Sequence, residues 1–191
     1  MSLILASASP RRREILATLG IAFDVDPSGA SEDARGEAPE ALARRLARDK
    51  ALEVSARRGE AFVLGADTIV VEGGAVLGKP ADDAEARAMI ARLAGRWHEV
   101  ITGVALVKGG AVLDDVAVTT RVHMLPMDEA RIARYVATGE GRDKAGAYAV
   151  QGIASGFCDR IEGSYTNVVG LPAAETVALL ERHSALAGGW P

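Results

Sequence analysis

The sequence alternates short apolar runs with longer amphipathic stretches, and this alternation restricts the chain to folds that combine strands with helices. The amphipathic stretches predict helices over residues 11–19, 39–58, 82–94, 128–138 and 172–185. The apolar runs predict strands over residues 3–6, 21–25, 61–64, 68–72, 75–77, 99–108 and 111–124, with short ones at 148–150 and 159–161. We therefore expect an α/β fold, a mixed sheet with flanking helices, followed by a frayed tail at residues 188–191.

Length and charge set the class of protein. A chain of 191 residues fits one domain over 1–191. Its net charge of -4 argues against a binder of nucleic-acid polymers, because such binding depends on many contacts of Lys and Arg with phosphate. No apolar run approaches the roughly 18 residues of a membrane span. The basic cluster at residues 11–13 follows the first apolar run, whereas a signal peptide has its charge in front. With a single Cys, the sequence predicts a cytoplasmic protein that binds no membrane.

The first candidate site is the turn at residues 7–13, SASPRRR, where Ser9 and Pro10 predict the start of a helix. Anions bind at helix N-termini, but cations in the first turn oppose the helix dipole. Three arginines at this place become favourable if an anion binds beside them. A solvated basic turn explains the same residues equally well.

Three further residues are candidates on local grounds. Lys50 lies in the middle of the apolar face of the helix predicted at 39–58, so it either extends past its neighbours to water or finds a partner inside. Asp67 follows an apolar run at a predicted strand end, where it could reach a metal ion or a water, or simply form a turn. Lys79 follows a glycine in a pattern similar to a phosphate-binding P-loop, but Pro80 replaces the Ser or Thr that would hold Mg²⁺. We reject the P-loop and keep Lys79 as a candidate phosphate contact.

Other familiar arrangements are absent from the sequence. His98, His123 and His183 have no spacing typical of a metal site, so we expect structural roles for them. Cys158 has no nearby histidine, and we expect an inert thiol. No Gly-x-Gly-x-x-Gly follows a predicted strand, which argues against a dinucleotide-binding domain.

Seven segments in one order resemble the Maf family of nucleoside triphosphate pyrophosphatases. Each is weak alone, but together they extend from Leu5 to about Leu180. They are LASASPRRREIL at 5–16, RLARDKA at 45–51, GADTIV at 65–70, GKP at 78–80, HEVITG at 98–103, KAGAYAVQG at 144–152 and IEGSYTNVVGLP at 161–172.

The resemblance implies an elongated α/β fold with two lobes around a central cleft, similar to the ITPase fold. It implies hydrolysis of a nucleoside triphosphate to the monophosphate and pyrophosphate with Mg²⁺ or Mn²⁺, and it suggests a homodimer. By position, the resemblance assigns Asp67 as the proton acceptor and Glu32 with Asp67 as metal ligands. It assigns the remaining roles, which are catalysis and substrate binding, to Lys50, Lys79, Ser7, Ser9, Arg11, Arg12, Thr68 and Gln151.

Substrate choice in the family is associated with the positions of Arg11, Thr68 and Gln151. The Ala-Asp-Thr form at 66–68 is similar to the branch that acts on dTTP and UTP, whereas a sister branch acts on 7-methyl-GTP. One departure is Ser31, which stands where many relatives have an Asp before the Glu. A second hypothesis, from the family's association with septum formation, is a nucleotide-dependent regulator of cell division without turnover.

Overall fold

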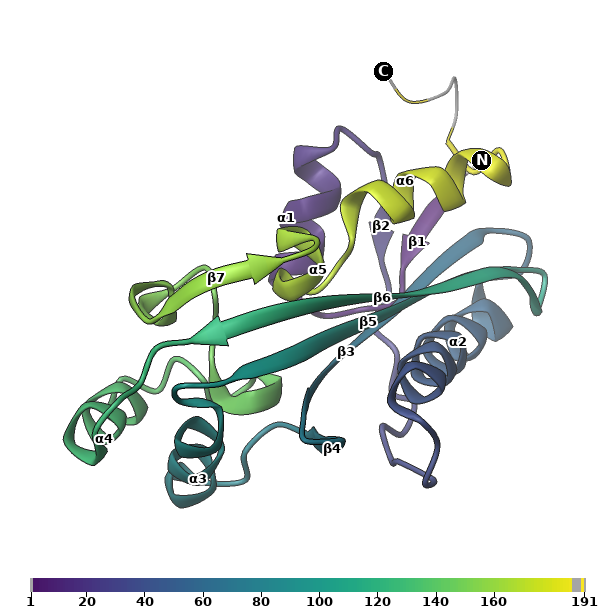
Figure 1. Cartoon of the computed structure of the whole chain (residues 1–191). Coiled ribbons are helices and arrows are strands. Elements are labelled where there is room, and N and C mark those ends of the chain that lie inside the picture. The colour runs from purple at the N-terminus through teal and green to yellow at the C-terminus, as the bar shows by residue number, and fades with distance from the viewer. Residues whose placement is uncertain (1, 187–189, 191) are drawn as a thin grey trace. The chain divides into compact units, whose positions relative to one another are not determined.

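The computed structural model describes residues 2–186 and 190, and these form a mixed α/β fold (Figure 1). Seven strands form one sheet in the order β2-β1-β3-β5-β6-β7, with β4 paired to β3. The strands are β1 Leu3–Leu5, β2 Asp24–Val25, β3 Phe62–Glu72, β4 Ala75–Leu77, β5 Trp97–Lys108, β6 Ala111–Met124 and β7 Cys158–Glu162. β1 runs parallel to β2 and β3, whereas β4 is antiparallel to β3 and β7 is antiparallel to β6.

Six α-helices connect and cover these strands. They are α1 Pro10–Thr18, α2 Pro39–Arg58, α3 Asp83–Leu93, α4 Glu129–Ala137, α5 Tyr165–Val169 and α6 Ala173–Arg182, with short 3-10 turns at Ala145–Ala147 and Ile153–Gly156. The chain divides into two compact units. The first contains the chain up to Thr68, Thr102–Val118 and the part from Gly170 onward, and the second contains Ile69–Ile101 and Thr119–Val169. β3, β5 and β6 each pass from one unit into the other.

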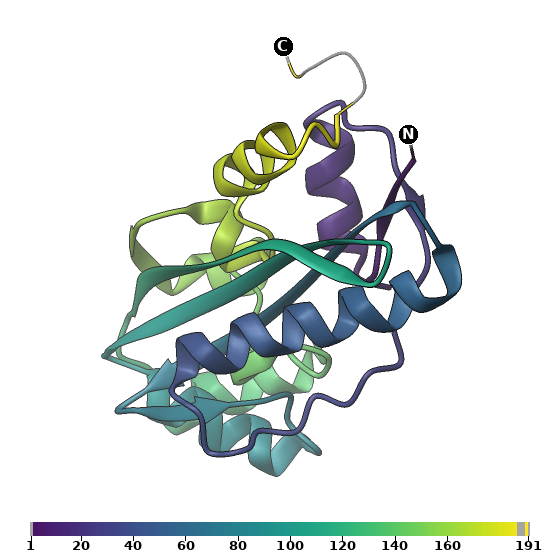
Figure 2. The same cartoon turned by 90° about the vertical axis from the view of Figure 1, so that its right-hand side faces the viewer.

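In the first unit, helices cover both faces of the strands. α2 lies on one side, and α1 and α6 lie on the other (Figures 1 and 2). Because successive strand residues point to opposite faces, Val63 of β3 packs on the side of α2 with Val54. Leu64 points the other way, into a cluster that includes Leu16 of α1 and Leu179 of α6. Both faces of this part of the sheet are therefore buried.

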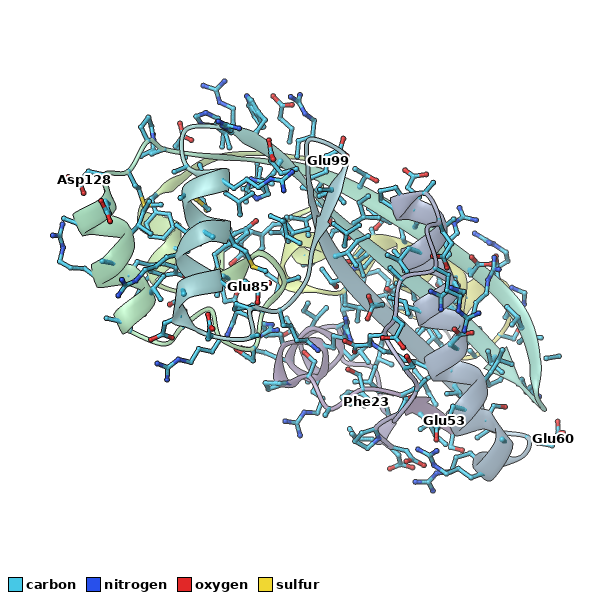
Figure 3. The ribbon with its side chains drawn as sticks, turned by 90° about the horizontal axis from the view of Figure 1, so that it is seen from below. Phe23, Glu53, Glu60, Glu85, Glu99 and Asp128 are labelled. Atoms are coloured by element: carbon cyan, nitrogen blue, oxygen red, sulfur yellow. The ribbon has the colours of Figure 1, made fainter. Side chains whose placement is uncertain are left out.

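In the second unit, α3 and α4 pack into one apolar cluster that includes Ile90, Leu93 and Ile132. An aspartate stands directly before each helix, at residues 82 and 128, where the sequence predicts the two helices to start. The Asp82 carboxylate accepts the N–H of Glu85 (2.8 Å), and the Asp128 carboxylate accepts the N–H of Arg131 (2.7 Å). Figure 3 shows Glu85 and Asp128 at these two helices. Such N-cap bonds satisfy backbone donors that have no partner within the helix.

Most of the expected elements are confirmed, but four details were wrong. β3 is continuous, so Asp67 lies inside a strand and not at a strand end. The strand expected at 21–25 is only Asp24–Val25, because the N–H of Ile21 instead closes the end of α1 on the Leu16 carbonyl. Residues 148 and 149 are irregular and residue 150 begins a turn, and the apolar character of all three reflects their burial. The short helix α5 was missed, since its five residues show no helical apolar pattern.

Two further expectations concern the ends of the chain and the membrane. In the predicted tail, residues 188, 189 and 191 lie outside the described residues. Of the helices in the described part of the chain, none combines the length and apolar character needed to cross a membrane.

Candidate active site

The centre of the candidate site is a buried ion pair between α2 and β3. Lys50 Nζ contacts Asp67 Oδ1, and these two residues are only 8% and 6% exposed. The same ammonium donates to Glu32 Oε1 at 2.6 Å. Of the two alternatives for Lys50, the structure therefore has the inward one: the side chain meets carboxylates and does not extend to bulk water.

Gly65 explains how α2 comes close enough for this contact. A Cβ at Gly65 would lie 2.2 Å from the Ala47 carbonyl oxygen and 2.9 Å from Ala51 Cβ, so only glycine allows this approach. Gly65 and Asp67 are two residues apart on β3 and therefore point to the same face. Lys50 is one helical turn from Ala47 and meets Asp67 there.

The acidic partner from the loop, Glu32, is exposed, and Arg45 of α2 anchors its loop. Arg45 Nη2 donates to the Asp33 carbonyl at 2.7 Å, and its guanidinium also contacts the Glu37 carboxylate. Arg45 lowers the pKa of Glu37 to about 2. Arg45 lies in one of the seven segments described above, at 45–51, but the sequence predicts no role for it. Its contacts indicate that it positions the loop that carries Glu32.

Arg12 is the second centre of the candidate site. Its guanidinium donates from Nε to the Gly170 carbonyl at 2.9 Å, and from Nη1 to Ser7 Oγ at 3.0 Å. Nη2 donates to Thr68 Oγ1 at 3.3 Å. Burial lowers the pKa of Arg12 from its ordinary value, while the Asp67 carboxylate opposes this change. Arg12 therefore joins the end of β1, the strand β3 and the chain before α6.

The neighbouring residues of the basic turn have different surroundings. Ser9 is the N-cap of α1, and its Oγ accepts the N–H of Arg12 at 3.5 Å. Arg11 is half-buried, and Arg13 is exposed. The three arginines are thus not one solvated cluster, because the guanidinium of the second, Arg12, is hydrogen-bonded to other parts of the protein.

Thr68 follows Asp67 directly and points to the opposite face of β3. Its hydroxyl lies 2.9 Å from Thr102 Oγ1 of β5, and it also approaches the Gly170 carbonyl at 3.4 Å. The sequence predicts no role for Thr102, although a polar residue within the otherwise apolar stretch 100–107 of β5 is a signal that could have found it. The hydroxyl of Thr68 is thus fixed by three neighbours.

Lys79 and Gln151 belong to the second unit, and both are exposed. Lys79 follows Gly78, whose carbonyl accepts the N–H of Gly146 at 3.1 Å. Gln151 lies in a turn that closes where the N–H of Gly152 donates to the Ala149 carbonyl at 2.9 Å. The roles that the sequence predicts for these two side chains remain predictions.

The carboxylates of Glu32 and Asp67 fit a divalent cation by their chemistry. Within residues 2–186 and 190, no group of three or more His, Cys, Asp or Glu side chains could hold a metal ion. Mg²⁺, however, is often bound by only one or two carboxylates, with water and substrate phosphates completing its coordination. Both carboxylates converge on one ammonium, so this place in the protein already attracts a positive charge.

The histidines have structural partners instead. His98 Nε2 lies 2.7 Å from the Tyr148 hydroxyl, and burial lowers the pKa of His98 to about 4. His123 contacts Asp159, and His183 lies near Asp114. Burial also raises the pKa of the Cys158 thiol to about 12, which favours the unreactive protonated form.

Comparison with known proteins identifies the family. A family model described as Maf-like protein matches residues 2–183. The chain is 50% identical over 188 residues to a dTTP/UTP pyrophosphatase of Geobacter sulfurreducens, covering 96% of this chain and 97% of that protein. It is 49% identical to a dTTP/UTP pyrophosphatase of Hahella chejuensis, with 94% and 90% of the two chains covered.

Among solved structures, a HAM1 protein from Coxiella burnetii matches with a TM-score of 0.49 and 14% identity, over 96% of this chain and 99% of that one. This likeness is weak, and we infer no activity from it. The family match, in contrast, includes both the Arg12 cluster and the Lys50–Asp67 pair. The chain belongs to the Maf-like protein family.

Proposed function

We propose that this protein hydrolyses nucleoside triphosphates, with dTTP and UTP as substrates, to the nucleoside monophosphate and pyrophosphate. Relatives that share about half of their residues with nearly the whole chain carry the name dTTP/UTP pyrophosphatase. The observation that carries the proposal is the buried pair of Lys50 and Asp67 with Glu32 beside it. A lysine that contacts two carboxylates in the interior can hold them in place for catalysis, whereas a lysine that extends to bulk water cannot.

In this mechanism Asp67 accepts a proton from the water that attacks the α-phosphorus. A bond forms from the water oxygen to phosphorus, the bond to the bridging oxygen of the β-phosphate breaks, and pyrophosphate leaves. The contact with Lys50 holds the Asp67 carboxylate in one orientation, which a general base requires. Lys50, with Arg11 and Lys79, would neutralise the charge of the triphosphate, and this kind of electrostatic stabilisation is usually the largest contribution to such reactions.

The divalent cation expected from the resemblance, Mg²⁺ or Mn²⁺, would be held by Glu32 and Asp67. When bound, such an ion lowers the pKa of a coordinated water and neutralises phosphoryl charge. With such an ion held by these two carboxylates, Lys50 would be available to the phosphates of the substrate.

Base selection would depend on Arg11, Thr68 and Gln151. A glutamine amide both donates and accepts hydrogen bonds, which suits the imide edge that uracil and thymine share. A site that makes such bonds rejects bases that leave its polar groups without partners. The cytoplasmic location and a homodimer stay predictions, as does the organisation of the chain as one domain.

The test is pyrophosphate release from a panel of triphosphates, which includes dTTP, UTP, CTP and 7-methyl-GTP, with Mg²⁺ or Mn²⁺. Asp67→Asn should reduce turnover by about 10²–10⁴-fold, the usual loss of a general base. Asp24→Asn, the same change at an exposed aspartate of β2, is the matched control and should keep wild-type turnover.

Lys50→Met leaves Asp67 buried without its ammonium partner, which can destabilise the fold by about 3–5 kcal/mol. The double variant Lys50→Met with Asp67→Asn removes both charges, so it should fold and remain inactive. Wild-type turnover of Asp67→Asn would exclude Asp67 from the mechanism. Nucleotide binding without repeated turnover by the wild-type protein would instead favour the cell-division regulator, and preference for 7-methyl-GTP would favour the sister branch.

A further inference from the structure

The turn that carries Gln151 is held by a single carboxylate, that of Glu140. Glu140 Oε2 accepts the backbone N–H of Ile153 at 2.6 Å, and Oε1 accepts the N–H of Ala154 at 3.1 Å. These are the first two residues of a 3-10 turn, Ile153–Gly156, where backbone donors lack partners within the turn. Charged acceptors make stronger hydrogen bonds than neutral ones, so Glu140 fixes the backbone just after Gln151.

The packing against Gly152 is equally specific. A Cβ at Gly152 would lie 2.2 Å from Glu140 Oε2 and 2.6 Å from Glu140 Cδ. The residue that follows Gln151 therefore has to be glycine for the carboxylate to reach the next two N–H groups. On the other side of Gln151, the N–H of Gly152 closes a turn on the Ala149 carbonyl at 2.9 Å.

Glu140 is itself anchored to the core of the second unit. The hydroxyl of the buried Tyr135 donates to Glu140 Oε1 at 3.0 Å, and Lys144 Nζ donates to the Glu140 carbonyl at 2.7 Å. Tyr135 packs edge-to-face on Phe157, with ring centroids 4.9 Å apart. The Glu140 carboxylate thus lies next to a buried aromatic pair of the second unit.

We propose that Glu140 is a positioning residue for base selection: it places the exposed amide of Gln151 by fixing the backbone of its turn. The inference rests on the proposed function, in which Gln151 contacts the base. An exposed glutamine on an unanchored turn would adapt to several bases. A glutamine whose backbone is fixed presents its donor and acceptor in one place, and discrimination between similar bases depends on such fixed hydrogen-bonding groups.

The test measures the ratio of kcat/KM for UTP to kcat/KM for CTP, because these bases differ at the edge that Gln151 would contact. Gln151→Ala removes the amide itself, and the fall in the ratio that it causes is the value with which the other variants are compared. Glu140→Gln keeps the size of the side chain, but its amide nitrogen cannot accept one of the two N–H groups. We expect this variant to lower the ratio about tenfold, through a higher KM for UTP with little change in kcat.

Tyr135→Phe is the matched control. It removes one hydrogen bond to the same carboxylate and leaves both backbone contacts in place, so the ratio should stay at the wild-type value even if the melting temperature falls. Gly152→Ala displaces the carboxylate without changing it, and it should reproduce the loss of the ratio. It also keeps the proposal testable if Glu140→Gln fails to fold.

The outcomes separate the proposal from its premise. If Gln151→Ala keeps the wild-type ratio, the proposed role of Gln151 is wrong and the inference fails with it. If Gln151→Ala lowers the ratio but Glu140→Gln and Gly152→Ala do not, only the inference is overturned. A fall in melting temperature with an unchanged ratio would make Glu140 a structural residue and nothing more.

Discussion

The contact of α2 with β3 at Gly65 gives the sharpest prediction of this structure. Gly65→Ala places a methyl group 2.2 Å from the Ala47 carbonyl oxygen, whereas ordinary contacts begin near 3.4 Å. The neighbour is backbone, so no side chain can turn away. α2 or β3 has to move by about 1 Å, the kind of shift that overpacking forces on a buried contact.

Two effects of this shift can be given magnitudes. Overpacking usually destabilises a protein by about 1–3 kcal/mol, and for a chain of this length that lowers the melting temperature by about 2–12 °C. The shift also separates Lys50 from Asp67, since Lys50 is one helical turn from Ala47. A misplacement of about 1 Å in a catalytic arrangement can reduce the rate about 100-fold, so we expect that loss in kcat/KM for UTP.

The assay compares Gly65→Ala with two other glycine variants at a temperature where all of them are folded. Gly103→Ala meets the Ala43 carbonyl oxygen at 2.1 Å, two helical turns from Lys50, so it should destabilise the protein similarly but reduce activity less. Gly156→Ala meets no atom within 4 Å and should change neither property. Equal losses of activity in Gly65→Ala and Gly103→Ala, or wild-type activity in Gly65→Ala, would refute the argument that this contact positions Lys50.

Three further predictions follow from the titrating groups. Burial lowers the pKa of His98 to about 4, so the unfolded chain binds the proton at a higher pH than the folded protein does. The free energy of unfolding should therefore fall as the pH decreases from about 6.5 to 4. Urea titrations of His98→Gln should show a flatter dependence on pH in this range. Arg57 and Arg58 lower the pKa of Asp26 to about 2, so the stabilisation by the ionised Asp26 is present above pH 3.8 and is lost as the pH falls towards 2. Asp26→Asn should remove this part of the loss of stability in acid. An unchanged dependence of stability on pH below 3.8 would contradict the assignment. The thiol of Cys158, with a pKa of about 12, should react with iodoacetamide at pH 8 about 10³-fold more slowly in the folded protein than in urea, and equal rates would show that it is not protected.

Local sequence patterns were sufficient for most of the secondary structure. The helix expected at 39–58 and the strand expected at 111–124 have those bounds in the structure. Asp82 and Asp128, the first residues of two of the predicted helices, are the N-caps of α3 and α4. These features depend on neighbours within a few residues, such as a side chain that caps a helix or an apolar residue that recurs at a fixed interval.

The break expected in β3 shows where local patterns mislead. Gly65 and Asp67 are typical of a turn when only their neighbours are considered. In the structure Gly65 lies inside β3, and it has no side chain because α2 at Ala47, 18 residues away in the chain, occupies the space that a side chain would need. The same close approach brings Lys50 to Asp67, so Asp67 is a buried partner of Lys50 and not the strand-end residue that the sequence predicts.

By itself the sequence determined the class of fold, most of the helices and strands and, through the resemblance, the residues to consider as a site. It left open whether Lys50 points inward, and it gave no sign that Asp67 and Thr68 face opposite sides of one strand. It did not single out Arg12 from its two neighbours, nor indicate that Glu140 holds the turn of Gln151. These were decided by tertiary structure, because they depend on contacts between groups far apart in the chain, such as Arg12 with Gly170, 158 residues apart. Apolar periodicity establishes which face of an element is buried, but the polar partner that a side chain meets there depends on the packing of the whole unit.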